Sequence, residues 1–153
     1  MGIRMTTPID DINKAIQSEL ERIDKIVIRA LSYLGELCVT EARDRPQDIS
    51  WIDHTGNLRS SIGYVIVKKG VIVKYSEFTH VKGGVDGSNE GKKFAETLAK
   101  QFVEDYVLVV VAGMNYAEYV EAIENKNVLA STELYATKNL PIIMRKLRRQ
   151  IAS

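Results

Sequence analysis

The feature that most constrains the fold is a long stripe of apolar residues in the first third of the chain. Apolar side chains recur there in alternating steps of three and four residues, at Ile9, Ile12, Ile16, Leu20, Ile23, Val27, Leu31, Leu34 and Cys38. This spacing places them on one face of a helix. We therefore predict one helix from about Thr7 to Asp44, with Thr7 as its cap, Pro8 in its first turn and Pro46 beyond its end.

A helix of this length is long for the size of the chain. It would span roughly 55 Å at about 1.5 Å per residue. A domain of 153 residues has a radius of gyration of only ~15 Å. Part of the apolar stripe would then lack cover within the molecule, so either the helix breaks near Gly35 or its uncovered part packs on another subunit.

The rest of the chain contains both strand-like and helix-like segments. Two β-branched runs, Gly63–Val67 and Val71–Tyr75, flank a glycine turn and predict a hairpin, and Tyr106–Ala112 predicts a central strand. We also expect a long loop over Ser76–Gly91, helices over Phe94–Phe102, over Tyr116–Glu124 and from Ser131 onward, and an interruption or kink near Pro141. This order predicts a single α+β domain over residues 1–153, with a long N-terminal helix, a small, mostly antiparallel sheet containing the hairpin, and a C-terminal helix.

Composition excludes several classes of protein. Hydrophobic residues make up 45% of the chain, which argues against wholesale disorder, and the longest apolar run, Val107–Ala112, is far too short to span a membrane. The net charge of +1 does not require nucleic acid or acidic lipid as a partner. Cys38 is the only cysteine, and the N-terminus has no apolar signal-peptide core, so we expect a soluble protein assembled in a reducing cytoplasm.

Motifs for metals and phosphates fail when their spacing is counted. Cys38, His54 and His80 share no metal-ligand spacing, so we assign no metal. A P-loop would need a serine or threonine where Lys93 stands. A calcium loop beginning at Asp86 would need a carboxylate where Thr97 stands, so no cofactor is expected.

One segment contains the residue types of a hydrolase. Asp53 and His54, followed by Ser60 and Ser61, could supply a carboxylate, a base and a nucleophile. Adjacent side chains rarely orient one another, and neither serine lies in a nucleophile-elbow pattern. A small hydrolase or nuclease using Asp53, His54 and a serine is therefore the alternative interpretation.

Two short segments are dense in specific residue types. In Thr55–Ile62, Thr55 can cap a helical turn, with Leu58 and Ile62 on one face and Arg59 on another. In Tyr116–Glu121, Tyr116, Tyr119 and Val120 share a helical face. Each segment alone is typical of a capped helix docking on a sheet.

Taken together and in this order, the two segments resemble the minor tail component family of long-tailed bacteriophages, also called tail-completion or neck proteins. The resemblance covers about Ile9 to Leu147. The positions that carry it are Thr55, Gly56, Leu58, Arg59, Ser61 and Ile62 in the first segment and Tyr116, Ala117, Tyr119, Val120 and Glu121 in the second.

The resemblance implies a structural virion protein without enzymatic activity. Members are small α+β proteins that form rings at the head-to-tail junction of a phage or prophage. The expected partners are copies of the chain itself, with a hexamer as one candidate ring size, the head–tail connector, and the tail tube or terminator proteins. DNA would only pass through the ring, no membrane would be involved, and the protein would end in the tail or neck of the virion.

Opposite charges near the C-terminal end of the sequence suggest contacts between subunits. Glu118, Glu121 and Glu124 recur every three residues, and Arg145, Arg148 and Arg149 lie close to the C-terminus. Such charges could join neighbouring subunits of a ring, or they could simply be solvated. A third interpretation, a host regulatory module, would use the basic segment Lys138–Arg149 for binding.

Overall fold

The computed structural model describes residues 2–4, 6–45, 53–114, 117 and 128–153. Along the chain the described elements are α1 (Ile9–Arg43), α2 (Asn57–Ser60), β1 (Ile62–Lys68), β2 (Val71–Tyr75), α3 (Val85–Ala99), β3 (Val107–Ala112) and α5 (Ala130–Ala152). The predicted α+β class is confirmed, as are the long N-terminal helix, the hairpin and the C-terminal helix. Within these residues, no helix is both long and apolar enough to cross a membrane.

Helix α1 is continuous over 35 residues, so of the two alternatives for the long stripe, the break near Gly35 is wrong. Gly35 instead allows a close contact, because a Cβ atom there would lie 2.7 Å from Cγ of the buried Tyr64 ring. The predicted cap is also wrong: Pro8 precedes the first helical residue, and no side chain caps the helix. Pro46, the predicted limit, lies outside the described residues.

The sheet has the strand order β2-β1-β3, and both strand pairs are antiparallel. The hairpin prediction is confirmed, but β3 lies at an edge of the described sheet and β1 is the central strand. The prediction of a central strand was based on the continuous apolar run of β3. Helices cover both faces of the sheet, so residues on both faces of an edge strand are also shielded from water, and such a run does not distinguish an edge strand from a central one.

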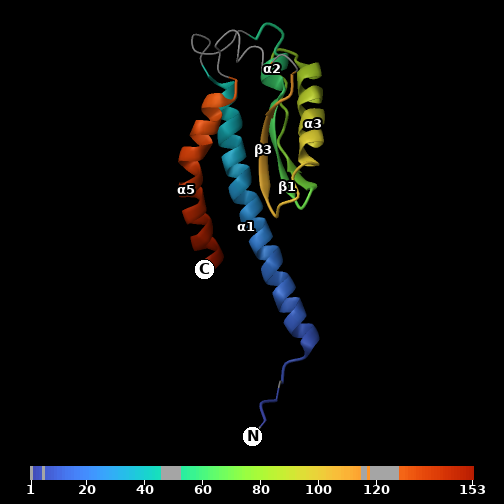
Figure 1. The fold of residues 1–153 in the computed structure, drawn as a ribbon, viewed down its shortest axis with the longest axis vertical. Helices are drawn as coiled ribbons and strands as arrows, with labels where there is room; N and C mark the ends of the chain where they lie inside the picture. The colour runs from blue at the N-terminus through green and yellow to red at the C-terminus, as the bar shows by residue number, and fades with distance from the viewer. Residues whose placement is uncertain (1, 5, 46–52, 115–116, 118–127) are drawn as a thin grey trace.

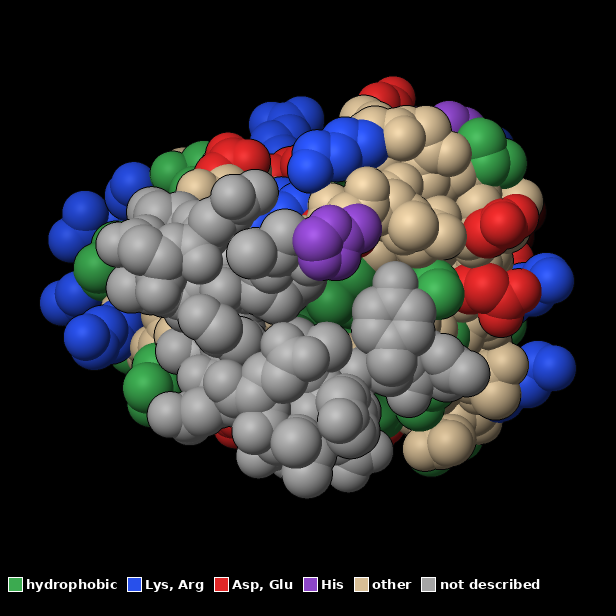
Figure 2. Space-filling view, turned by 90° about the horizontal axis from the view of Figure 1, so that it is seen from above, with side chains coloured by type: hydrophobic (Ala, Val, Ile, Leu, Met, Phe, Trp, Pro, Cys, Tyr) green, Lys and Arg blue, Asp and Glu red, His purple; other side chains and the backbone are tan. Residues whose placement is uncertain are grey.

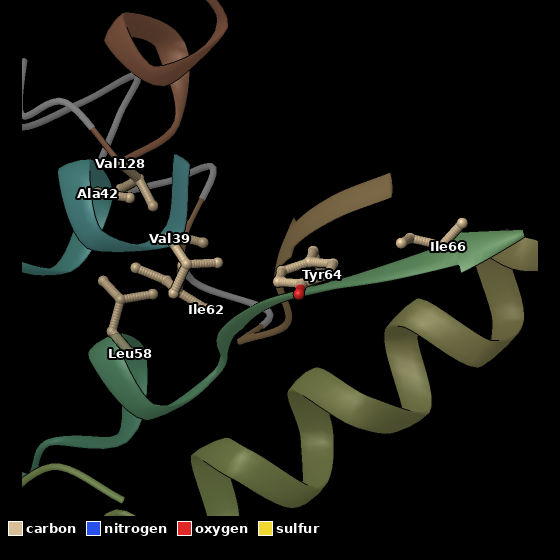
Figure 3. Packing of buried hydrophobic residues seen from close by; sticks show 8 residues of the cluster. Val39, Ala42, Leu58, Ile62, Tyr64, Ile66 and Val128 are labelled. Carbon is tan, nitrogen blue, oxygen red and sulfur yellow. The ribbon is translucent and has the colours of Figure 1, made fainter. Parts of the chain in front are cut away.

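The sheet lies between helices (Figure 1). Helix α1 packs on one face, with α5 alongside α1, and α3 packs on the opposite face. Figure 3 shows the cluster on the α1 face, where Val39 and Ala42 meet Leu58, Ile62 and Tyr64. On the α3 face, Val65 and Val67 of β1 pack with Ala95 and Ala99.

Two further sequence predictions need correction. The segment Ser76–Gly91 is a loop only up to Gly84, because α3 begins at Val85. Gly87 is tolerated inside this helix because it packs against the backbone of α2, where a Cβ atom would lie 2.0 Å from the carbonyl oxygen of Asn57. Helix α5 continues through Pro141, whose side of the helix is exposed, so the carbonyl of Thr137 that loses its partner can be hydrated.

Candidate assembly surfaces and the motif that supports them

The first motif segment forms the short helix α2 and its capping turn. Gly56 precedes the helix with φ +78°, a left-handed conformation that favours glycine. The carboxylate of the buried Asp53 accepts hydrogen bonds from the backbone N–H of Gly56 at 3.0 Å and of Arg59 at 2.8 Å. The predicted cap, Thr55, is exposed and accepts only the N–H of Asn57, at 3.3 Å. Asp53 is therefore the capping side chain, a role that the sequence analysis missed although Asp is a favoured capping residue.

The apolar residues of this motif are core residues, as their predicted shared face implies. Leu58 and Ile62 are fully buried and pack with Val39 and Ala42 of α1 (Figure 3). Ser61 is buried between two backbone segments: its hydroxyl donates to the carbonyl of Leu58 at 2.7 Å and accepts the N–H of Met114 at 3.3 Å. The motif therefore joins α1, β1 and the end of β3.

Arg59 joins α2 to the C-terminal end of α1. Its guanidinium donates to the carbonyl of Arg43. Arg43 in turn donates to the carbonyls of Arg59, at 3.1 Å, and of Ile62. Burial lowers the pKa of the Arg43 guanidinium, and these backbone carbonyls partly replace the water it has lost. The structure thus assigns Arg59 a positioning role within the fold.

The second motif segment can be placed at one position only. Ala117 is buried in the cluster on the α1 face, and its N–H donates to the carbonyl of Met114 at 3.0 Å. The other predicted residues of this segment, Tyr116, Glu118, Tyr119, Val120, Glu121 and Glu124, lie outside the described residues.

The hydrogen bonds of the candidate hydrolase side chains go to backbone groups and not to one another. Asp53 binds backbone N–H groups, His54 is exposed, and the Ser60 hydroxyl accepts the N–H of Val81 at 2.7 Å. In the described part of the chain, no hydrogen bond links His54 to Asp53, Ser60 or Ser61. Nor do the described residues contain a group of three or more His, Cys, Asp or Glu side chains that could hold a metal ion.

The predicted basic residues lie on the exposed side of α5. Arg145, Arg148 and Arg149 are exposed and form no ion pair among the residues described. Figure 2 looks onto the end of the molecule that carries α2 and shows Lys and Arg side chains gathered on its left, the side on which α5 lies in Figure 1. Their predicted acidic partners around residue 121 lie outside the described residues.

An apolar groove, which the sequence analysis did not predict, runs between α5 and β3 with α1 as its floor. It has a volume of about 720 Å³. Its lining includes Leu34 and Cys38 from α1, Leu108 and Val110 from β3, and Ala136 and Leu140 from α5. The groove forms because α5 packs on α1 through Ile143 and makes few contacts with the sheet.

The contact between α5 and α1 is reinforced by a polar cluster at the upper end of the two helices in Figure 1. Glu41 of α1 pairs with Arg45 at 2.8 Å and accepts hydrogen bonds from the hydroxyls of Ser131, at 3.3 Å, and Thr132. Arg45 and Thr132 are buried. These contacts fix the position of α5 and therefore the width of the groove.

We compared the chain with protein-family models, with curated proteins and with solved structures, and none of the three comparisons finds a match.

Proposed function

We propose that this chain is a structural protein of the tail or head–tail junction of a phage or prophage, and that it acts by assembling into a ring that joins the tail to the head connector. The observation that carries the proposal is that α1 extends beyond the domain into which it is packed. From Arg22 onward the helix contacts other elements of the domain, whereas its N-terminal part, Ile9–Glu21, extends beyond them with apolar residues exposed (Figure 1).

The motif behind the family resemblance supports the same proposal. Its described residues stabilise the junction between α1, α2 and β1 and form no reactive cluster. A protein that works through interfaces needs such a rigid scaffold to hold its contact surfaces in place. In this proposal the partners are further copies of the chain, the head–tail connector, and the tail tube or terminator proteins, and DNA only passes through the ring. The finished location is the virion, after assembly in the bacterial cytoplasm.

The genes beside the one that encodes this chain provide a first test. We expect neighbours that encode capsid, portal and tape-measure proteins, whereas a surrounding set of metabolic genes would contradict the proposal.

A stop codon early in the gene of the intact phage or prophage provides the decisive test. After induction we expect electron micrographs to show separate heads and tails, and a plasmid copy of the gene should restore joined particles. A normal yield of infectious particles without the gene product would refute the proposal. Nuclease and esterase assays of the purified protein address the hydrolase alternative directly.

A further inference from the structure

A second, smaller hollow lies beside the contact between α1 and α5, on the side away from the apolar groove. It has a volume of about 250 Å³. The buried Ile143 of α5 packs against α1 between the two depressions. The polar and charged side chains that line the hollow are Arg29 and Tyr33 of α1 and Lys146 and Gln150 of α5. The hollow therefore differs from the groove in being lined by two cations.

The hollow belongs to a larger group of basic side chains on the same side of the two helices. Residues three, four or seven positions apart share one face of a helix. The spacing therefore places Arg149, Arg145 and Lys138 on the same side of α5 as Lys146, and Lys25 on the same side of α1 as Arg29. We call these six residues the basic face. All six are exposed, and none forms an ion pair among the described residues.

Acidic residues are absent from the stretches of sequence that build the basic face. None occurs at positions 25–35 or 138–150. The carboxylates that flank the first stretch are already bound, because Asp24 accepts a hydrogen bond from Lys68 at 2.6 Å and Glu36 accepts one from the Tyr64 hydroxyl at 2.9 Å. The rest of the chain has 15 basic and 20 acidic residues, a net charge of −5, so the total of +1 conceals a separation of charge. A surface of one sign attracts a partner of the opposite sign.

The residue types of the basic face favour phosphate groups as that partner. Arg29 and Lys146 supply positive charge at the hollow, and the hydroxyl of Tyr33, which is 57% exposed, and the amide of Gln150 are further donors. Side chains of these types contact phosphate oxygens in protein–DNA complexes. Along α5 the face extends from Lys138 to Arg149, roughly 16 Å. A stretch of B-DNA of that length carries roughly nine phosphate charges, so the face matches a polymer of phosphates better than one small anion.

The width of the basic face indicates which part of DNA it can contact. Packed helices lie about 8–10 Å apart, and each is about 10–12 Å wide with its side chains. Two helices side by side are therefore roughly 20 Å wide, which exceeds the ~12 Å width of the major groove. The face can reach the backbone but not the base edges. A lipid surface fits less well, because the apolar side of α5, with Ile143, packs on α1 and is not free to insert.

We propose that the basic face binds the phosphate backbone of double-stranded DNA without sequence preference, and that the ring turns this face toward the DNA that passes through it. The second part of this inference rests on the proposed function, whereas the first part does not. Contacts to phosphates alone allow a protein and DNA to slide past each other. Such a face would guide DNA through the ring without holding it at one sequence.

The salt dependence of DNA binding tests the proposal. Fluorescence anisotropy with two labelled duplexes of unrelated sequence should give equal affinities. Six phosphate contacts predict a slope of about −5 in a plot of log affinity against log salt concentration, and a loss of roughly a thousandfold between about 50 and 200 mM salt. The variant with Lys146→Gln and Arg149→Gln should reduce the magnitude of the slope by about 2.

The matched control is the variant with Lys74→Gln and Lys100→Gln. It removes the same charge from exposed positions outside the basic face, so its slope should equal that of the parent protein. Circular dichroism checks that both variants fold, and light scattering after size exclusion compares their oligomeric states.

Several results would overturn the assignment of this face to DNA. They are no binding at about 50 mM salt, an equal change of slope in the control, and tighter binding to anionic lipid vesicles or to polyglutamate than to DNA. A changed oligomeric state of the Lys146→Gln, Arg149→Gln variant would also overturn it, because the face would then be a contact between subunits. The gene-disruption phenotype is measured separately. DNA binding by the basic face together with a normal yield of particles in the disrupted phage would refute the virion role alone.

Discussion

Replacement of Asp53 by Ala tests the strongest correction that the structure makes to the sequence analysis. Asp53 is 3% exposed, and its carboxylate accepts hydrogen bonds from the backbone N–H groups of Gly56 and Arg59. Without it, both donors at the start of α2 lose their partner where water has little access. An unsatisfied buried polar group costs about 1–3 kcal/mol, and a lost cap about 0.5–2 kcal/mol. We therefore expect Asp53→Ala to lower the free energy of unfolding by about 2–4 kcal/mol.

A thermal melt measures this effect. For a domain of this size the expected loss corresponds to a fall in Tm of about 5–12 °C. Thr55→Ala is the matched control: Thr55 is exposed and its single hydrogen bond is 3.3 Å long, so its replacement should cost about 0.5 kcal/mol or less. Asp53→Asn, which keeps an acceptor oxygen, should fall between the two. If Thr55→Ala destabilises the protein as much as Asp53→Ala does, the assignment of the cap is wrong.

Three other residues give independent tests. Cys38 is 1% exposed, and its burial and, to a lesser extent, the charge of Glu41 raise the pKa of its thiol. A thiol reagent should therefore label Cys38 slowly in the native protein and quickly in denaturant, and rapid native labelling would refute its burial. Burial, reinforced by the hydrogen bond to Glu36, raises the pKa of Tyr64 to about 12. The raised pKa therefore adds about 2 kcal/mol to the free energy of unfolding below pH ~10, and this contribution is lost as the pH rises through ~12. Denaturant titrations should show the loss in the parent protein but not in Tyr64→Phe. Equal losses in both proteins would contradict this. Gly35→Ala should lower the free energy of unfolding by about 1–2 kcal/mol despite the better helix propensity of Ala, because the new Cβ atom would press on the Tyr64 ring. An unchanged or higher Tm would show that the ring can move aside.

The fold was largely predictable because its main elements have strong periodic signals. The stripe from Ile9 to Cys38 repeats at the helical period, and the runs on either side of Gly70 are rich in β-branched residues, so α1 and the hairpin follow from local rules. The start of α3 at Val85 could not be predicted from such local rules. Gly87 and Gly91 resemble loop residues in the sequence, and only the close approach of Asn57 to Gly87 and of Ser61 and Phe78 to Gly91 explains why a helix contains them.

The candidate site was less predictable because it depends on contacts between distant segments. Asp53 and Thr55 are both favoured capping residues, and the choice between them depends on where the chain enters α2. The groove requires α5 to pack on α1, a contact that depends on the hydrogen bonds of the half-buried Glu41 with the buried Arg45 and Thr132. No local pattern carries that information. The exposure of part of the apolar stripe could, however, be predicted from the sequence, because the predicted helix is longer than a domain of this size.

Helix α1 is divided into a part supported by other elements, from Arg22 onward, and a projecting segment, Ile9–Glu21, and this division has a consequence for amide hydrogen exchange. A segment of this length is marginally stable without tertiary contacts, although it extends an existing helix and so needs no nucleus of its own. Its amide protons should therefore exchange by fraying from the Ile9 end, while those beyond Asp24 exchange only when the domain opens. The single helix would show a gradient of protection along its length, and any partner that covers the projecting segment would move the boundary of that gradient toward the N-terminus.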